Sequence, residues 1–284
     1  MEAFAEISEL KKQIDDFRLG PIDLTIEPGT INALVGNNGS GKSTLIKLMM
    51  DLATPDSGHI KIFRTRTDTS DETWKTKVAY LPQTPIGYNP YTGKDLKAIT
   101  APMYPDWDDE VFAEIAGKFH LPLDKKYGKL SQGMQQKLSL ALTIPRNAPI
   151  LILDEPTSFM DIPSKELLMD ILTRWMDQGE RTIIMASHQA ADIMKLTDYL
   201  FVLQDGRMNG VFEKDTLVSS YKQYWLSTPL PNTTVPGEIT RENQHIISNQ
   251  PEQTEAFFRE NHLPVTNRAA LDLEEIIGLL LRQP

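Results

Sequence analysis

The chain has 284 residues, no cysteine and a formal net charge of −10 at pH 7. Its length suits one large α/β domain with an appendage, or two modest domains, and its 40% hydrophobic content suits a globular core. Without cysteine there can be no disulfide or thiolate metal site. The acidic balance also argues against a nucleic-acid partner, because neutralising phosphates needs basic stripes.

The first 65 residues are rich in strand patterns. Residues 22–26 alternate between apolar and polar side chains, and residues 59–63 do so again after a turn at residues 56–58. Residues 31–35 and 78–81 are short apolar runs typical of buried strands. No apolar run of the chain approaches the ~20 residues that span a bilayer.

A phosphate-binding loop follows the apolar run at 31–35 and precedes a predicted helix at 44–50. The loop fits the pattern G-x-x-x-x-G-K-[ST], in which backbone N–H groups wrap the phosphates of a nucleotide at the positive end of a helix. Lys42 would reach the β- and γ-phosphates of ATP, and the Ser43 hydroxyl would face Mg²⁺. The residues of the loop are Gly36, Asn37, Asn38, Gly39, Ser40, Gly41, Lys42, Ser43 and Thr44. The pattern predicts that the chain binds a nucleoside triphosphate.

The middle of the chain, about residues 90–145, has the spacing of helices. Asp108 or Asp109 can cap one helix, and Ser131 stands where another can begin. Continuous apolar runs at 150–153 and 181–186 predict central strands of a parallel sheet with helices on both faces. The sequence therefore favours a doubly wound α/β fold.

Two carboxylates end the apolar run at 150–153. Asp154 is placed to hold the Mg²⁺ shell, as the second acidic element of such sites does. Glu155 would project toward the γ-phosphate and orient the attacking water as a general base.

Taken in order, these motifs resemble the ATP-binding cassette (ABC) ATPases over about residues 4–215. The signature Leu-Ser-Gly-Gly-Gln corresponds to residues 130–134, with Gln132 and Met134 replacing its third and fifth positions. The other matching residues are Lys42 in the phosphate loop, Gln83 in the Q-loop, Asp154 and Glu155 in the acidic pair, Asp161 in the D-loop, and Ser187 and His188 at the switch histidine.

The resemblance implies a P-loop NTPase fold, with a mixed or parallel core sheet and a helical signature subdomain at about 90–145. We expect the ABC-type domain to occupy residues 1–220. Beyond a breaker-rich segment at 229–237, we expect a small α+β appendage at 221–284, with a strand at 244–248 and helices at 252–261 and 271–281.

The resemblance also implies a head-to-tail dimer, either of two identical chains or with a second ABC ATPase. Each ATP would lie between the phosphate loop of one chain and Ser131, Gln132 and Gly133 of the other. Gln83 would reach the metal or the water, and His188 would bridge the γ-phosphate and Glu155. An aromatic residue near the N-terminus stacks on adenine in the family, and Phe17 or Phe4 could do so here.

For function, the resemblance implies an ATP-hydrolysing subunit on the cytoplasmic face of a membrane, powering separate transmembrane permease subunits. Residues 103–109, the signature and the short C-terminal appendage are similar to the YtrB-like group of bacterial export-type cassettes, which implies export of drugs, antimicrobial peptides or similar amphiphiles. The alternatives are an importer, a soluble ABC ATPase of DNA repair or translation, and a non-catalytic ATP-binding scaffold. Long coiled-coil insertions, typical of the repair proteins, do not occur in this sequence.

Overall fold

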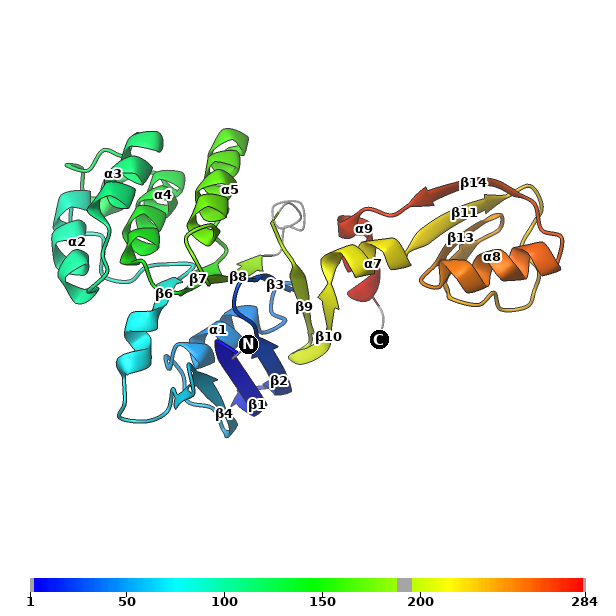
Figure 1. The fold of residues 1–284 in the computed structure, drawn as a ribbon, viewed down its shortest axis with the longest axis horizontal. Coiled ribbons are helices and arrows are strands. Elements are labelled where there is room, and N and C mark those ends of the chain that lie inside the picture. Colours follow the sequence, from blue (N-terminus) through cyan, green and yellow to red (C-terminus); the bar gives the residue numbers. More distant parts are fainter. Residues whose placement is uncertain (1–2, 188–195, 283–284) are drawn as a thin grey trace. The chain divides into compact units, whose positions relative to one another are not determined.

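The computed structural model describes residues 3–187 and 196–282, and the chain divides into two compact units. Figure 1 shows both units, Met1–Val211 and Phe212–Pro284. The division falls inside strand β10 (Arg207–Glu213). The residue at which we expected the first domain to end, Ser220, is the last residue of helix α7 (Lys214–Ser220).

A six-stranded sheet forms the centre of the first unit, in the order β10-β9-β3-β8-β7-β6. Every adjacent pair from β9 to β6 is parallel. The strands are β3 (Ile31–Val35), β6 (Val78–Leu81), β7 (Ile150–Asp154), β8 (Thr182–Ser187) and β9 (Tyr199–Gln204). All residues of β3, β7 and β8 are buried, as their continuous apolar runs predict for strands covered on both faces.

A second sheet in this unit is antiparallel, in the order β2-β1-β4-β5. Its strands are β1 (Ala5–Ile14), β2 (Phe17–Ile26), β4 (Ser57–Ile62) and β5 (Thr65–Arg66). Helix α1 (Lys42–Met49) follows β3 and shares one apolar core with this sheet and with the central sheet. The parallel core with its helices agrees with the predicted α/β fold, and the antiparallel sheet is an addition that the apolar runs did not indicate.

Helices form the remaining part of the first unit, drawn in cyan and green in Figure 1. Asp108 caps α3 and Ser131 caps α4, as the sequence predicts. Helices α2 and α3 both contact α4. The helices are α2 (Gly93–Thr100), α3 (Asp109–Lys118), α4 (Gln132–Thr143) and α5 (Ile162–Met176), with short 3₁₀ turns at Thr73–Lys77, Ala101–Met103, Tyr127–Lys129 and Ile144–Arg146.

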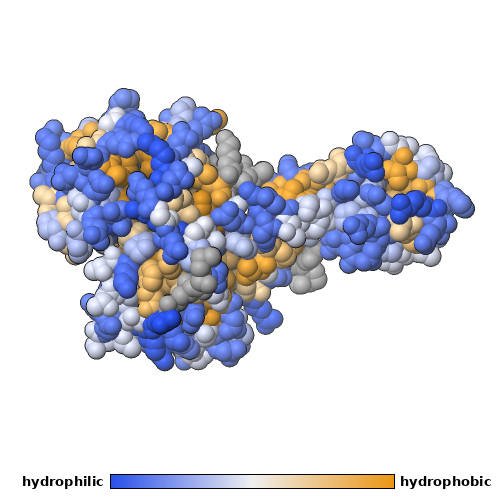
Figure 2. Space-filling model, viewed as in Figure 1, coloured by the Kyte–Doolittle hydropathy of each residue, from blue (hydrophilic) through white to orange (hydrophobic). Residues whose placement is uncertain are grey.

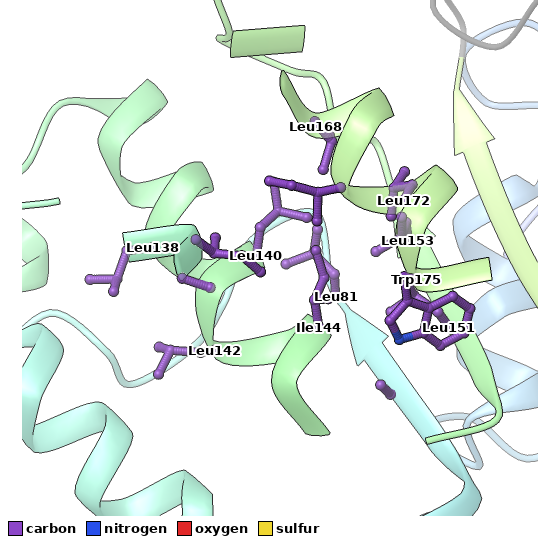
Figure 3. Packing of buried hydrophobic residues seen from close by; sticks show 14 of the residues in the cluster. Leu81, Leu138, Leu140, Leu142, Ile144, Leu151, Leu153, Leu168, Leu172 and Trp175 are labelled. Atoms are coloured by element: carbon purple, nitrogen blue, oxygen red, sulfur yellow. The ribbon is translucent and has the colours of Figure 1, made fainter. Parts of the chain in front are cut away.

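The apolar face of α4 fixes this helix against the central sheet. Figure 3 shows Leu140 of α4 among Leu168 and Leu172 of α5, with Leu81 and Leu153 contributed by strands β6 and β7. All five side chains are fully buried. Burying a leucine side chain contributes about 1.5–3 kcal/mol, so this cluster holds the C-terminal half of α4 in place relative to the end of β7.

The second unit is a small α+β structure with a four-stranded antiparallel sheet in the order β12-β13-β11-β14. Its elements are α7, β11 (Lys222–Leu226), β12 (Glu238–Glu242), β13 (His245–Ser248), α8 (Pro251–Glu260), β14 (Val265–Ala270) and α9 (Leu273–Leu280). Tyr224, Ile246 and Phe258 form its core together with Leu226 and Val235. The predicted strand and both predicted helices are present, whereas β11, β12 and β14 carried no clear pattern.

Polar side chains cover most of the visible face in Figure 2, with small apolar areas between them. Within the part of the chain that the structure describes, no helix combines the length and apolar character that crossing a membrane requires.

Candidate functional site

The phosphate-binding loop connects β3 to α1, as the sequence predicts. Gly39 and Gly41 have φ angles of 82° and 108°, which side chains rarely adopt. A Cβ on Gly36 would lie 2.2 Å from the Leu203 carbonyl oxygen. Only glycine at these positions lets the backbone turn this tightly beside β9.

The loop presents donors that an anion would satisfy. Helix α1 begins at Lys42 with no capping side chain and no acidic residue in its first turn, so its first N–H groups have no partner within the helix. The Ser40 hydroxyl oxygen is buried, and among the described residues it has no hydrogen-bond partner. These features fit the phosphates of a nucleotide, which accept hydrogen bonds at a helix N-terminus.

Lys42 lies inside the loop, with only 6% of its surface exposed. Its Nζ donates to the carbonyl oxygens of Gly36, at 2.8 Å, and Asn37, at 3.2 Å. Burial lowers the pKa of Lys42, and the nearby carboxylates of Glu155 and Asp154 partly oppose this. The ammonium group is thus poorly hydrated and suited to a phosphate of opposite charge.

The acidic pair lies at the end of β7, beside the phosphate loop. The Ser43 hydroxyl donates to Asp154 Oδ1 over 3.3 Å, which brings a hydroxyl and a carboxylate oxygen together. Burial raises the pKa of Asp154, and the neighbouring Glu155 also raises it, while the bond from Ser43 opposes both. Burial, with a smaller effect of Asp154, likewise raises the pKa of Tyr80 on the adjacent strand to about 12.

The oxygen atoms of Ser43 and Asp154 suit Mg²⁺, since hard cations prefer oxygen ligands. In the described ranges, no group of three or more His, Asp or Glu side chains could hold a metal by itself. A site with few protein ligands agrees with the usual state of Mg²⁺, which is bound by one or two side chains together with phosphates and water.

A cavity of about 450 Å³ gathers the predicted residues. The phosphate loop, Gln83 and Glu155 all contribute to its wall, although they come from separate parts of the sequence. The lining residues are Ile14, Phe17, Asn38, Gly39, Gly41, Lys42, Ser43, Thr44, Gln83 and Glu155. This volume lies within the range of ~300–1,000 Å³ typical of small-molecule sites.

An apolar wall of this cavity comes from the β1–β2 hairpin. Phe17 lies beside the loop, because a Cβ on Gly41 would be 2.9 Å from its ring. Phe4, the alternative candidate, packs instead against Phe63, with ring centroids 4.6 Å apart. Ile14, 43% exposed, also lines the cavity, and sequence reasoning missed it. Only its position just before the hairpin turn could have indicated it.

The signature residues lie elsewhere in the same chain. The Ser131 side chain caps α4 by accepting a hydrogen bond from the Met134 N–H. None of Ser131, Gln132 and Gly133 is among the residues that line the cavity described above. Asp161 caps α5 by accepting from the Ser164 N–H at 3.1 Å. Of the remaining switch motif, Ser187 ends β8, and His188 lies outside the described residues.

A second cavity, of about 550 Å³, lies in the C-terminal unit and contains no predicted site residue. Its buried Tyr224 donates to Glu255 at 3.0 Å, and Lys222 also contacts Glu255. These polar groups satisfy one another, so we assign them to the stability of the unit.

Comparison with known proteins identifies the family. The family model described as ABC transporter matches residues 19–158. The chain is 29% identical to the ABC transporter ATP-binding protein YtrB of Bacillus subtilis (strain 168), over 95% of this chain and 96% of that one. It is 30% identical to the bacitracin transport ATP-binding protein BcrA of Enterococcus faecalis, over 73% and 68%.

The fold has close counterparts among solved structures. An ATP-binding subunit of an ABC transporter superposes with a TM-score of 0.69 and 25% identity, covering 76% of this chain and 92% of the other. The P-loop NTPase fold with a mixed sheet is therefore confirmed. The chain belongs to the ABC transporter family, as an ATP-binding subunit that hydrolyses ATP.

Proposed function

We propose that this subunit powers an exporter of drugs, antimicrobial peptides or similar amphiphiles through ATP-driven closure of a head-to-tail dimer. The similarity to a bacitracin transport protein supports the substrate class. The chain also resembles a ribose import protein at 28% identity, but it spans only about half of that protein. The YtrB match extends over nearly the whole of both chains, including the C-terminal unit, and this favours the export-type group.

One ATP would occupy the cavity between the phosphate loop and Glu155. The loop's N–H groups and Lys42 would bind its phosphates, and the ring of Phe17 would stack on adenine. Ser43, Asp154 and Gln83 would hold Mg²⁺, partly through water. When bound, Mg²⁺ supplies positive charge that offsets the charge on the phosphate oxygens. Glu155 would accept a proton from the attacking water, and His188 would assist at the γ-phosphate.

The separation of the signature from this cavity carries the dimer proposal. Ser131 and Gly133 lie at the start of α4, where backbone N–H groups can bind a second anion. In a head-to-tail pair, the signature of one chain would complete the ATP site of the other, whether the partner is an identical chain or a second ABC ATPase. Phe159 and Ile162, 66% and 74% exposed beside Asp161, provide apolar surface for such a partner.

Further exposed apolar side chains support docking to separate transmembrane permease subunits, which would place the protein on the cytoplasmic face of the membrane. Ile86 lies in the loop after Gln83 and is 93% exposed. Ile99 and Met103, at the end of α2 and just beyond it, are also exposed. Large apolar side chains that are exposed in this way provide surface for protein contacts.

Two assays test the nucleotide site. Lys42→Ala should weaken binding of ATP by about 100-fold or more, because a buried phosphate would lose its charged partner. Lys47→Ala, in the last turn of α1, is the matched control and should bind ATP as the unmodified protein does. Equal affinity in both variants would contradict the site. Vesicles that contain the membrane subunit, with this protein and ATP on their outer face, would then decide between export and import. An exporter would carry labelled peptide into these vesicles, whereas an importer would carry labelled sugar out of them.

A further inference from the structure

Gln136 is a buried polar side chain of α4 that touches the catalytic end of β7. It is 5% exposed, and its Nε2 donates to the carbonyl oxygens of Glu155 and Pro156, both at 3.2 Å. A primary amide nitrogen has two N–H donors, so these two bonds use both of them. The side chain therefore connects the signature helix to the backbone of the residue that we propose as general base.

Glu155 has a backbone conformation that needs such support. Its φ is 54°, in the left-handed region that non-glycine residues rarely adopt. The Glu155 N–H donates to the Ala186 carbonyl at 2.9 Å, and the Ser158 N–H donates to the Glu155 carbonyl at 3.2 Å. Gln136 adds a bond from a different element, so β8, the following turn and α4 together hold this peptide.

Two other residues of the first turns of α4 contact the same loop. A Cβ on Gly133 would lie 2.6 Å from the Phe159 carbonyl oxygen, so α4 and the loop are in close contact there. The Lys137 ammonium lies 3.8 Å from Asp161 Oδ1. Positions 133, 136 and 137 share one face of a helix. This face of α4 therefore packs along the whole loop from Glu155 to Asp161.

We propose that Gln136 is a positioning residue for hydrolysis, which orients Glu155 through its main chain and joins it to the signature turn. The first turns of α4 and the loop 155–161 then move as one body. Docking of the signature on a nucleotide held by the partner chain would, by this connection, set the orientation of Glu155 in its own site. This inference rests on the proposed role of Glu155.

Gln136→Met tests the proposal, since methionine fills the same space without a donor. We expect kcat for ATP to fall about tenfold, equivalent to about 1.4 kcal/mol, while the KM for ATP changes little, because no group that binds ATP is altered. The matched control is Gln135→Met. Gln135 also donates from α4 to a backbone carbonyl, that of Tyr127 at 3.0 Å, but Tyr127 lies in the turn Tyr127–Lys129 and not in the loop 155–161. The control should keep its kcat.

Equal kcat values in the Gln136→Met, Gln135→Met and unmodified proteins would overturn the proposal, as would an equal loss in both variants. If Gln136→Met does not fold, Gln136→Glu decides in the same assay. Glutamate has the same size but places an acceptor against the two carbonyl oxygens, so kcat should fall further.

A Glu155→Gln variant, measured in the same assay, tests the role of Glu155 independently of Gln136. If Glu155→Gln keeps normal turnover, the proposed function of Glu155 fails. If Glu155→Gln loses turnover while Gln136→Met matches the unmodified protein, only the positioning role fails. Adding Gln136→Met to Glu155→Gln should cause no further loss in the residual rate, since Gln136 acts through Glu155. A further tenfold loss would show that it acts elsewhere.

Discussion

A pair of glycine-to-alanine changes should have opposite effects on stability. Gly133 in α4 and Gly117 in α3 are both helical, and alanine favours a helix over glycine by about 1 kcal/mol. The space around them differs. A Cβ at position 133 meets a backbone oxygen at 2.6 Å, whereas nothing lies within 4 Å of one at position 117.

The magnitudes follow from this difference. Gly117→Ala should raise the free energy of unfolding by about 0.5–1 kcal/mol. Gly133→Ala gains the same helix preference, but it forces α4 and the loop apart, at a cost of roughly 1–3 kcal/mol for overpacking. The net effect is a loss of about 1 kcal/mol, so the two variants should differ by about 2 kcal/mol, or roughly 4–8 °C in Tm for a unit of this size.

Calorimetry of the full chain without nucleotide measures this difference, using the transition of the first unit. ATP hydrolysis should also fall in Gly133→Ala and remain normal in Gly117→Ala. If both variants were stabilised equally, α4 would not pack against the Phe159 carbonyl, and the close contact between the signature and the loop would be refuted.

Three further outcomes are expected. Phe17→Ala should weaken ATP binding about tenfold by removing the stacking surface, whereas Phe17→Trp should retain it. Equal affinities for ATP in both variants, measured by isothermal titration calorimetry, would show that Phe17 does not stack on adenine. Asp154→Asn should stabilise the nucleotide-free protein at neutral pH, because a carboxyl whose pKa is raised by burial opposes folding once it ionises. This gain in the free energy of unfolding should shrink as the pH falls toward the ordinary carboxyl pKa of about 3.9. Thermal melts that show the same gain at every pH would contradict this. Ile86→Ser should reduce co-purification of a membrane subunit. Leu52 is also apolar and is 63% exposed, and Leu52→Ser should not reduce it. Equal recovery of the membrane subunit with both variants would show that Ile86 is not part of the docking surface.

Patterns within one segment predicted much of the first unit. The apolar runs of β3, β7 and β8 are long enough, and free enough of polar residues, to indicate strands buried on both faces. Asp108 and Ser131 indicated helix starts, because a capping side chain is a local signal. The phosphate loop was equally clear, since its glycines are required by backbone geometry.

Features that depend on tertiary contacts could not be predicted in this way. Strand β14 is exposed at nearly all of its positions and lies at the edge of its sheet, so it has no apolar alternation. Gln136 resembles any polar residue of a helix until α4 is placed against β7. Ile14 and Phe17 lie together only because the β1–β2 hairpin reaches the phosphate loop.

The structure shows where the two signature residues that differ from the family pattern, Gln132 and Met134, lie. Gln132 is exposed in the first turn of α4, where its side chain needs no space inside the fold. Met134 is half-buried and packs against the core of the helical part, while its N–H donates to Ser131. Neither change removes the hydroxyl of Ser131 or the close approach of Gly133.

The association state of Glu155→Gln with ATP and Mg²⁺ tests the central claim most directly. Since we propose Glu155 as the general base, replacing it should leave ATP bound and uncleaved, so the closed pair should persist. Size-exclusion chromatography with light scattering should show a dimer with ATP and a monomer with ADP, alongside little turnover. A variant that remains monomeric with ATP and hydrolyses it at the normal rate would contradict a site shared between two chains.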